Sequence, residues 1–191
     1  MTRRILAAGA LLLALAGCAS DRQPSNVENA CAIFDSRPHW ERDVLRAESK
    51  WGAPAHVAMA IIWKESSFQH DAAPSRRYAF GFIPMGRRSS AYGFPQALDG
   101  TWDWYVTDTG NRGAVRDDFG DAADFVGWYM RQSRTQNGID MNDAYNQYLA
   151  YHEGHAGWRR KTYRSKSWLT GVAKDVQNKS EEYRRQIARC T

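Results

Sequence analysis

The chain has 191 residues, of which 26 are basic and 21 acidic, giving a formal net charge of +5 with histidine neutral. This length suits one domain with a core of its own, and the sequence contains no internal repeat that would indicate a second domain. The apolar run at residues 5–16 is too short to span a bilayer, which excludes it as a transmembrane helix.

The N-terminus is typical of an exported protein. Arg3 and Arg4 precede the apolar run, and small residues follow it up to Cys18, which is the order of zones in a secretory signal. The residues Leu-Ala-Gly-Cys ending at Cys18 resemble a bacterial lipobox, so we expect residues 1–17 to be a lipoprotein signal peptide and Cys18 to carry the lipid. The alternative is an ordinary signal peptide with an incidental cysteine. By resemblance to lipoprotein sorting rules, Ala19 in place of Asp favours a periplasmic location with the anchor in the outer membrane.

Two further cysteines lie near the ends of the exported part. An oxidising compartment would let Cys31 and Cys190 form a disulfide, and Cys190 continues the apolar stripe of the last predicted helix. Two buried free thiols are the alternative. Residues 18–30 are polar and lack periodicity, which predicts a lipidated N-terminus and flexible tether before a domain over residues 31–191.

Helical periodicity accounts for most of that domain. Ser36 and Pro38 can start a helix with an apolar face, which Gly52 ends. Pro54 then sits in the first turn of a helix that is apolar on all sides. Further helices are expected after the capping candidates Asp117 or Asp118 and Asn142 or Asp143, and near Ser167. With no strand-length alternation, the expected fold class is mainly α.

Residues 71–92 lie in a stretch dense in Pro, Gly and Ser that predicts a long irregular loop. Near Arg87 and Arg88, this loop carries the apolar residues Tyr78, Phe80, Phe82, Ile83 and Met85. Three interpretations stay open for these residues: a flap over a groove, a surface that docks a partner, or a segment folded back onto the core.

Glu65 stands at the end of the wholly apolar helix. A carboxyl in an apolar pocket has its charged form disfavoured, so its pKa rises and it keeps its proton towards neutral pH. Such a group suits a general acid that protonates a glycosidic oxygen. By itself the position is weak support, because an apolar helix also commonly ends in a solvated glutamate.

Three motifs that follow one another along the chain strengthen the interpretation of Glu65 as a general acid. The first is Glu65-Ser66, the second runs from Gly93 to Thr101 and reads GFPQALDGT, and the third runs from Ala150 to Gly154 and reads AYHEG. These resemble the Glu-Ser, Gly-Leu-Met-Gln-x-x-Pro-x-Thr and Ala-Tyr-Asn-Ala-Gly motifs of the lysozyme-like lytic transglycosylases of the soluble, family 1 type. The resemblance covers roughly residues 40–158 and implies a lysozyme-like single domain that cleaves the β-1,4 bond of peptidoglycan and leaves a 1,6-anhydro sugar.

The resemblance also implies residue roles. Glu65 would be the catalytic acid and then the base, while the sugar's own acetamido group replaces a second carboxylate. The implied substrate-binding residues are Ser66, Gln96, Tyr151, Tyr92 and Gly93, with Tyr151 orienting Glu65 or stabilising the transition state. This chain departs from the family pattern most in the third motif, where His152 and Glu153 replace Asn and Ala.

Glu153 leaves a second mechanism open. If it lay across the groove from Glu65, a hydrolysis with two carboxylates would be possible. A binding module that grips glycan strands without turnover is a further alternative. The order His152-Glu153-Gly154-His155 differs from the His-Glu-x-x-His pattern of zinc peptidases, so no metal and no cofactor are expected.

The stretch at residues 158–168 holds five cations in eleven residues. It could meet anionic lipid or an acidic polymer, or be an ordinary solvated loop. Export argues against nucleic acid as the partner. The expected partners are therefore peptidoglycan glycan strands and, through the lipid, a membrane, with the chain itself a monomer.

Overall fold

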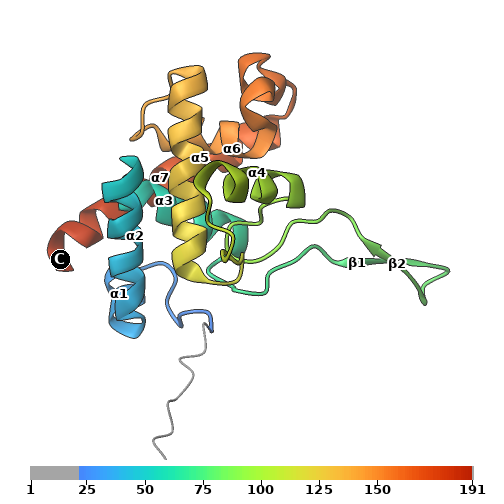
Figure 1. The fold of residues 1–191 in the computed structure, drawn as a ribbon, viewed down its shortest axis with the longest axis horizontal. Helices are drawn as coiled ribbons and strands as arrows, with labels where there is room; N and C mark the ends of the chain where they lie inside the picture. The colour runs from blue at the N-terminus through green and yellow to red at the C-terminus, as the bar shows by residue number, and fades with distance from the viewer. Residues whose placement is uncertain (1–21, 191) are drawn as a thin grey trace, which may run out of the picture.

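The structure is a computed structural model that describes residues 22–190 (Figure 1), except for the side chain of residue 77. The expected signal peptide and the lipidation at Cys18 lie outside the described residues. In chain order the elements are α1 (Ala30–Ser36), α2 (Pro38–Trp51), α3 (Ala55–Ser66), β1 (Arg76–Ala79), β2 (Ile83–Arg87), α4 (Asp99–Thr109), α5 (Phe119–Asn137), α6 (Ala144–Arg159), the 3-10 turn η1 (Thr162–Ser165) and α7 (Ser167–Cys190). The expected mainly α single domain is confirmed.

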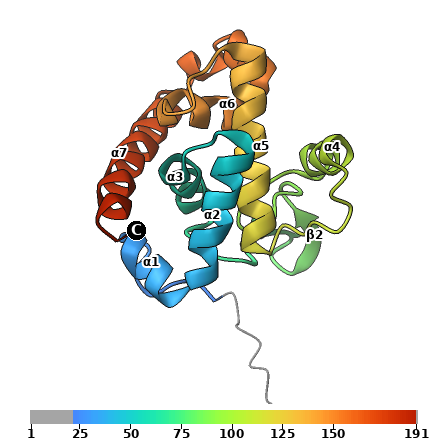
Figure 2. The same ribbon diagram turned by 60° about the vertical axis from the view of Figure 1, so that its left-hand side comes forward.

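Helix α3 is the centre of the core. Its residues from Val57 to Ile62 are all buried, on every side of the helix. A helix that is apolar all round is stable only when other elements surround it. Helices α2, α5, α6 and α7 pack against it, and Figure 2 shows it enclosed between α7 on one side and α2 and α5 on the other.

The surrounding helices begin where the sequence predicts. The side chain of Asp118 accepts a hydrogen bond from the backbone of Asp121 at the start of α5. Asp143 does the same for Asn146 at the start of α6. Each bond satisfies a backbone N–H that the first turn of a helix leaves without a partner, which fixes where the helix starts. None of the helices within residues 22–190 is long and apolar enough to cross a membrane.

The loop after α3 differs from the prediction because it contains a two-stranded antiparallel hairpin. Ala79 pairs with Ile83, and the chain reverses through Phe80 and Gly81, both of which have positive φ angles. The hairpin projects from the helical body in Figure 1. The sequence shows no strand-length alternation here, because this ribbon covers no core face and so has no alternation of buried and exposed residues.

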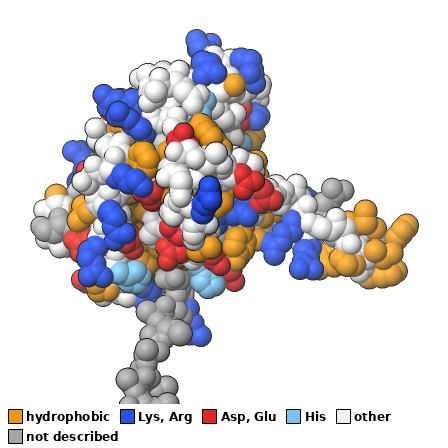
Figure 3. All heavy atoms as spheres, viewed as in Figure 1, with side chains coloured by type: hydrophobic (Ala, Val, Ile, Leu, Met, Phe, Trp, Pro, Cys, Tyr) orange, Lys and Arg blue, Asp and Glu red, His pale blue; other side chains and the backbone are white. Residues whose placement is uncertain are grey.

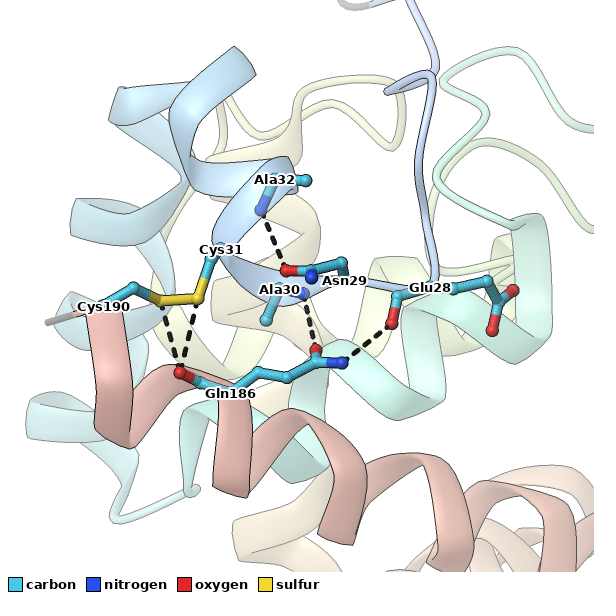
Figure 4. Close-up of a disulfide and its surroundings, with 7 residues drawn as sticks. All are labelled: Glu28, Asn29, Ala30, Cys31, Ala32, Gln186 and Cys190. Atoms are coloured by element: carbon cyan, nitrogen blue, oxygen red, sulfur yellow. Dashed lines mark hydrogen bonds between the residues drawn. A yellow bond between two sulfur atoms is a disulfide. The ribbon is translucent and has the colours of Figure 1, made fainter.

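The two ends of the domain are joined as predicted by a disulfide between Cys31 and Cys190. Gln186 of α7 reinforces the junction in Figure 4, since its side chain accepts from the backbone of Ala30 at 2.7 Å and donates to that of Glu28 at 3.2 Å. Residues 22–29, part of the expected tether, contact the domain. Glu28 forms an ion pair with Lys179, for example.

We predict that Cys31→Ser with Cys190→Ser lowers the free energy of unfolding. The bridge spans a sequence separation of 159 residues. Closing so long a loop restricts the unfolded chain and contributes at most about 5 kcal/mol. Denaturant unfolding of the oxidised wild type and the double variant measures the loss, for which we expect about 2–5 kcal/mol. A reductant should lower the free energy of unfolding of the wild type and leave that of the double variant unchanged. Equal free energies of unfolding for the oxidised wild type and the variant would contradict the prediction.

Candidate active site

A pocket of about 420 Å³ opens beside the end of α3. Four parts of the chain line it: the end of α3, the loop into α4 with the first turn of that helix, the middle of α5, and the part of α6 that leads up to its kink at Gly154. The lining residues are Glu65, Gln96, Ala97, Leu98, Thr101, Phe125, Tyr129, Tyr151, His152, Glu153 and Gly154. The pocket has the size of a small-molecule site and brings together residues from all three sequence motifs.

Glu65 contributes its carboxyl in the last turn of α3. The residue is partly exposed because it lines the pocket, while protein atoms enclose the carboxyl on its other sides. Burial raises the pKa of Glu65 to about 7, although a hydrogen bond with Tyr148 and the charge of Lys64 act in the opposite direction. The negative end of the α3 dipole also disfavours a carboxylate there. Glu65 is therefore poised to hold or release a proton near neutral pH.

Two tyrosines of α6 lie near this carboxyl, and their hydroxyls donate to different acceptors. Tyr148 forms the hydrogen bond with the Glu65 carboxyl. The hydroxyl of Tyr151 donates instead to the carbonyl of Pro95 at 2.6 Å. Burial raises the pKa of Tyr151 well above its usual value, and the nearby charge of Glu65 raises it further. Tyr151 thus keeps its proton and ties α6 to the loop that carries Gln96.

Gln96 fixes the shape of that loop. Its side-chain amide donates to the carbonyl of Ala72 at 2.7 Å and to that of Gly93 at 2.8 Å. Gly93 has a φ of 72°, and a Cβ built on it would lie 2.1 Å from the carbonyl oxygen of Arg116. Only glycine fits so close an approach in this conformation. The second motif therefore forms a rigid wall of the pocket.

Some predicted site residues lie elsewhere. Ser66 is buried and donates to the carbonyl of Ile62 at 3.2 Å, so its hydroxyl is absent from the pocket lining. The hydroxyl of Tyr92 points to Asp117, at 3.4 Å. Gly93 supports the wall without lining the pocket. Of the predicted set, the structure brings together Glu65, Gln96 and Tyr151.

Sequence reasoning missed two tyrosines of this site. Tyr148 lies three residues before Tyr151, so the two share one face of α6. That spacing was the available signal for a second tyrosine near the carboxyl. Tyr129 of α5 lines the pocket, and its ring stacks on His155 with centroids 4.4 Å apart. No pattern in the sequence indicated that this tyrosine would face a pocket.

Glu153 lines the same pocket but its carboxyl is engaged by the protein. It accepts a hydrogen bond from Lys166 at 2.6 Å, one from the hydroxyl of Thr162, and it contacts His152 at 3.1 Å. Burial alone would raise the pKa of Glu153, but these three donors outweigh it and lower the pKa to about 2. Glu153 thus lies next to the kink at Gly154 within α6, and its ionised carboxyl binds Thr162 and Lys166 in the segment after that helix.

The family comparison identifies the same class of protein as the motifs. A family model described as "Transglycosylase SLT domain" matches residues 6–190. No curated protein matches the chain at a significant level. With the helical architecture described above, the family match confirms the lysozyme-like fold class expected from the sequence.

We predict that the difference in free energy of unfolding between Glu65→Gln and the wild type is more favourable to the variant at pH 8 than at pH 4. The pKa of Glu65 is raised from 4.5 to about 7 on folding, so between these values the folded chain binds a proton that the unfolded chain has released. Stability therefore falls as the pH rises through this window, by roughly 3 kcal/mol in total. The glutamine variant lacks this penalty.

Urea unfolding of the wild type and the variant at both pH values measures the effect. Glu181→Gln on the exposed side of α7 is the control for the loss of one surface carboxylate. The difference between Glu65→Gln and the wild type should be larger at pH 8 by about 2–3 kcal/mol. An identical difference at pH 4 and pH 8 would show that folding leaves the Glu65 carboxyl unperturbed.

Proposed function

The chain belongs to the transglycosylase SLT domain family, and we propose that it is a lytic transglycosylase that cleaves the β-1,4 bond between MurNAc and GlcNAc with Glu65 as acid and base. Family membership implies an enzyme that acts on peptidoglycan. The observation that carries the finer proposal is a single carboxyl with a pKa of about 7 in a pocket lined by the motif residues.

In the first step, protonated Glu65 donates its proton to the glycosidic oxygen. The bond from this oxygen to C1 of MurNAc breaks, and GlcNAc leaves with a 4-hydroxyl group. The electron deficiency at C1 is met by the carbonyl oxygen of the acetamido group on the same MurNAc. A carboxyl that is half protonated near pH 7 gives up its proton at little cost at this point.

In the second step, the Glu65 carboxylate takes the proton of the MurNAc 6-hydroxyl. The 6-oxygen attacks C1, the acetamido oxygen leaves, and a 1,6-anhydro ring closes without the addition of water. The hydrogen bond from Tyr148 is stronger to the ionised carboxyl than to the neutral one, so Tyr148 stabilises Glu65 between the two steps. Tyr148 is a positioning residue in this scheme.

The state of Glu153 favours this mechanism over hydrolysis. A hydrolase with two carboxylates needs the second one free to activate water or to attack the sugar. Lys166 and Thr162 both donate to the Glu153 carboxyl, which limits its freedom to do either. Glu153 instead binds Thr162 and Lys166 in the segment after α6.

The location of the enzyme is a separate proposal that rests on the sequence. The ordered basic, apolar and small-residue zones before Cys18 support export and a lipid on that residue. We place the enzyme in the periplasm as a monomer, anchored to the outer membrane, where its substrate lies.

We predict that the protein releases muropeptides that end in 1,6-anhydro-MurNAc from purified peptidoglycan, and that Glu65→Gln abolishes the release. Mass spectrometry separates these products from hydrolysed ends, which are heavier by one water. Glu153→Gln is the matched control and should retain anhydro products. Reducing ends would instead indicate hydrolysis, and retention on peptidoglycan without any released product would indicate a binding protein.

We predict that the rate falls as the pH rises above about 7, because only protonated Glu65 can start the reaction. One unit above the pKa, about one tenth of the carboxyl is protonated. Tyr148→Phe removes the hydrogen bond that lowers the pKa of Glu65, so the fall should move to higher pH. Rates of muropeptide release from pH 5 to 9 measure both effects. Tyr145→Phe, on the same helix and outside the pocket, is the control; a fall that moves to lower pH in Tyr148→Phe would contradict the scheme.

A further inference from the structure

The β1–β2 hairpin exposes an unusual concentration of apolar side chains. Those of Phe80, Phe82 and Met85 are 88%, 74% and 60% exposed, and those of Tyr78 and Ile83 are 55% and 43% exposed. We call these five residues the apolar tip. In Figure 3 it forms a continuous hydrophobic surface at the end of an extension away from the body. An exposed apolar patch of this kind marks a surface that contacts something apolar.

Basic residues bracket this surface on the chain. Residues 76–88 read RRYAFGFIPMGRR, with two arginines at each end and no acidic residue between them. The strand register places Arg76 directly opposite Arg87, so cations gather at the base of the hairpin, and basic side chains are visible there in Figure 3. An apolar tip with a basic base matches the apolar interior and anionic headgroups of a bilayer.

The distribution of the side chains over the ribbon favours lipid over a protein groove. Tyr78 is paired with Pro84, while Ile83 and Met85 lie two residues apart on the opposite face of β2. A groove that accepts a strand covers one face of the ribbon, whereas a fluid acyl phase surrounds all sides of an inserted tip. The tip also has no part in the lining of the active-site pocket.

We propose that the hairpin inserts its apolar tip into the surface of a membrane that contains anionic phospholipid. The tip enters the boundary between headgroups and acyl chains, and the arginines at the base bind the phosphates. Insertion of this element alone holds the domain at the bilayer in a defined orientation.

The described N-terminus lies on the same side of the domain as the base of the hairpin. Arg22 and Gln23 line a small cavity together with Gln69, His70 and Asp71, which lead into the hairpin. The side chain of Gln23 donates to the carbonyl of Ser67 at 2.8 Å. The expected lipidation site, Cys18, precedes Arg22 by four residues in the sequence and lies outside the described residues.

The test is the binding of unlipidated protein to vesicles. The mature chain from residue 18 with Cys18→Ser is mixed with vesicles of phosphatidylethanolamine and phosphatidylglycerol, and separately with phosphatidylcholine alone, and bound protein is measured by sedimentation. We expect binding to the anionic vesicles, at least tenfold weaker binding to the neutral ones, and weaker binding at high salt. Absence of binding to anionic vesicles, or equal binding to both compositions, would overturn the proposal.

Two pairs of variants test whether the hairpin is responsible. Phe80→Ser with Phe82→Ser should weaken binding at least tenfold, whereas Leu45→Ser with Val115→Ser, at other exposed apolar positions, should leave it unchanged. Arg87→Gln with Arg88→Gln should weaken binding to anionic vesicles. Arg160→Gln with Arg164→Gln changes the net charge equally in the segment that follows α6 and should have little effect.

The same variants distinguish a membrane from the other binding partners that the hairpin could have, namely peptidoglycan and a second copy of the chain. None of the eight substituted residues lines the active-site pocket, so turnover of solubilised peptidoglycan should persist in all four variants whether or not they bind vesicles. If the phenylalanine pair instead abolished sedimentation with peptidoglycan, or a dimer seen by analytical ultracentrifugation, while vesicle binding was unchanged, the hairpin would be a glycan or self-association surface and the membrane proposal would be wrong.

Discussion

The burial of α3 is the constraint on which the rest of the structure depends. Its apolar sides require a shell of helices, and α2, α5, α6 and α7 provide it. The same shell encloses the carboxyl at the end of the helix on the sides that do not face the pocket. The property that makes Glu65 useful as an acid therefore follows from the packing that stabilises the fold, because desolvation raises its pKa to about 7.

The pocket keeps its shape through contacts between elements that are distant in the chain. Tyr151 of α6 donates to the backbone at Pro95, and Gln96 donates to the backbone at Ala72. Together with the hydrogen bond between Tyr148 and Glu65, these contacts join all three motifs into one frame. Preorganised donors of this kind keep the acid in place before the substrate arrives.

The sequence predicted those features that depend on local patterns. Asp118 and Asp143 precede apolar periodic segments and do cap helices, and an exported chain with Cys31 and Cys190 at its ends forms the expected disulfide. Features that depend on the packing of elements distant in the chain could not be predicted from such local patterns. The hydroxyl of Ser66 donates to the backbone carbonyl one turn earlier in its own helix instead of facing the pocket, and residue spacing does not reveal this choice of acceptor. The hydrogen bond between Tyr148 and Glu65 forms only because α6 packs against α3. The hairpin was missed because it buries no face.

The central claim is that Glu65 holds its proton near neutral pH because the fold buries its carboxyl. The most direct measurement is the titration of that carboxyl by NMR in protein labelled with carbon-13 at the glutamate side chains, with Glu65→Gln used to assign the resonance. The account predicts a midpoint close to pH 7. A midpoint near 4.5, the value of an unburied glutamate, would contradict it and leave the proposed acid without its physical basis.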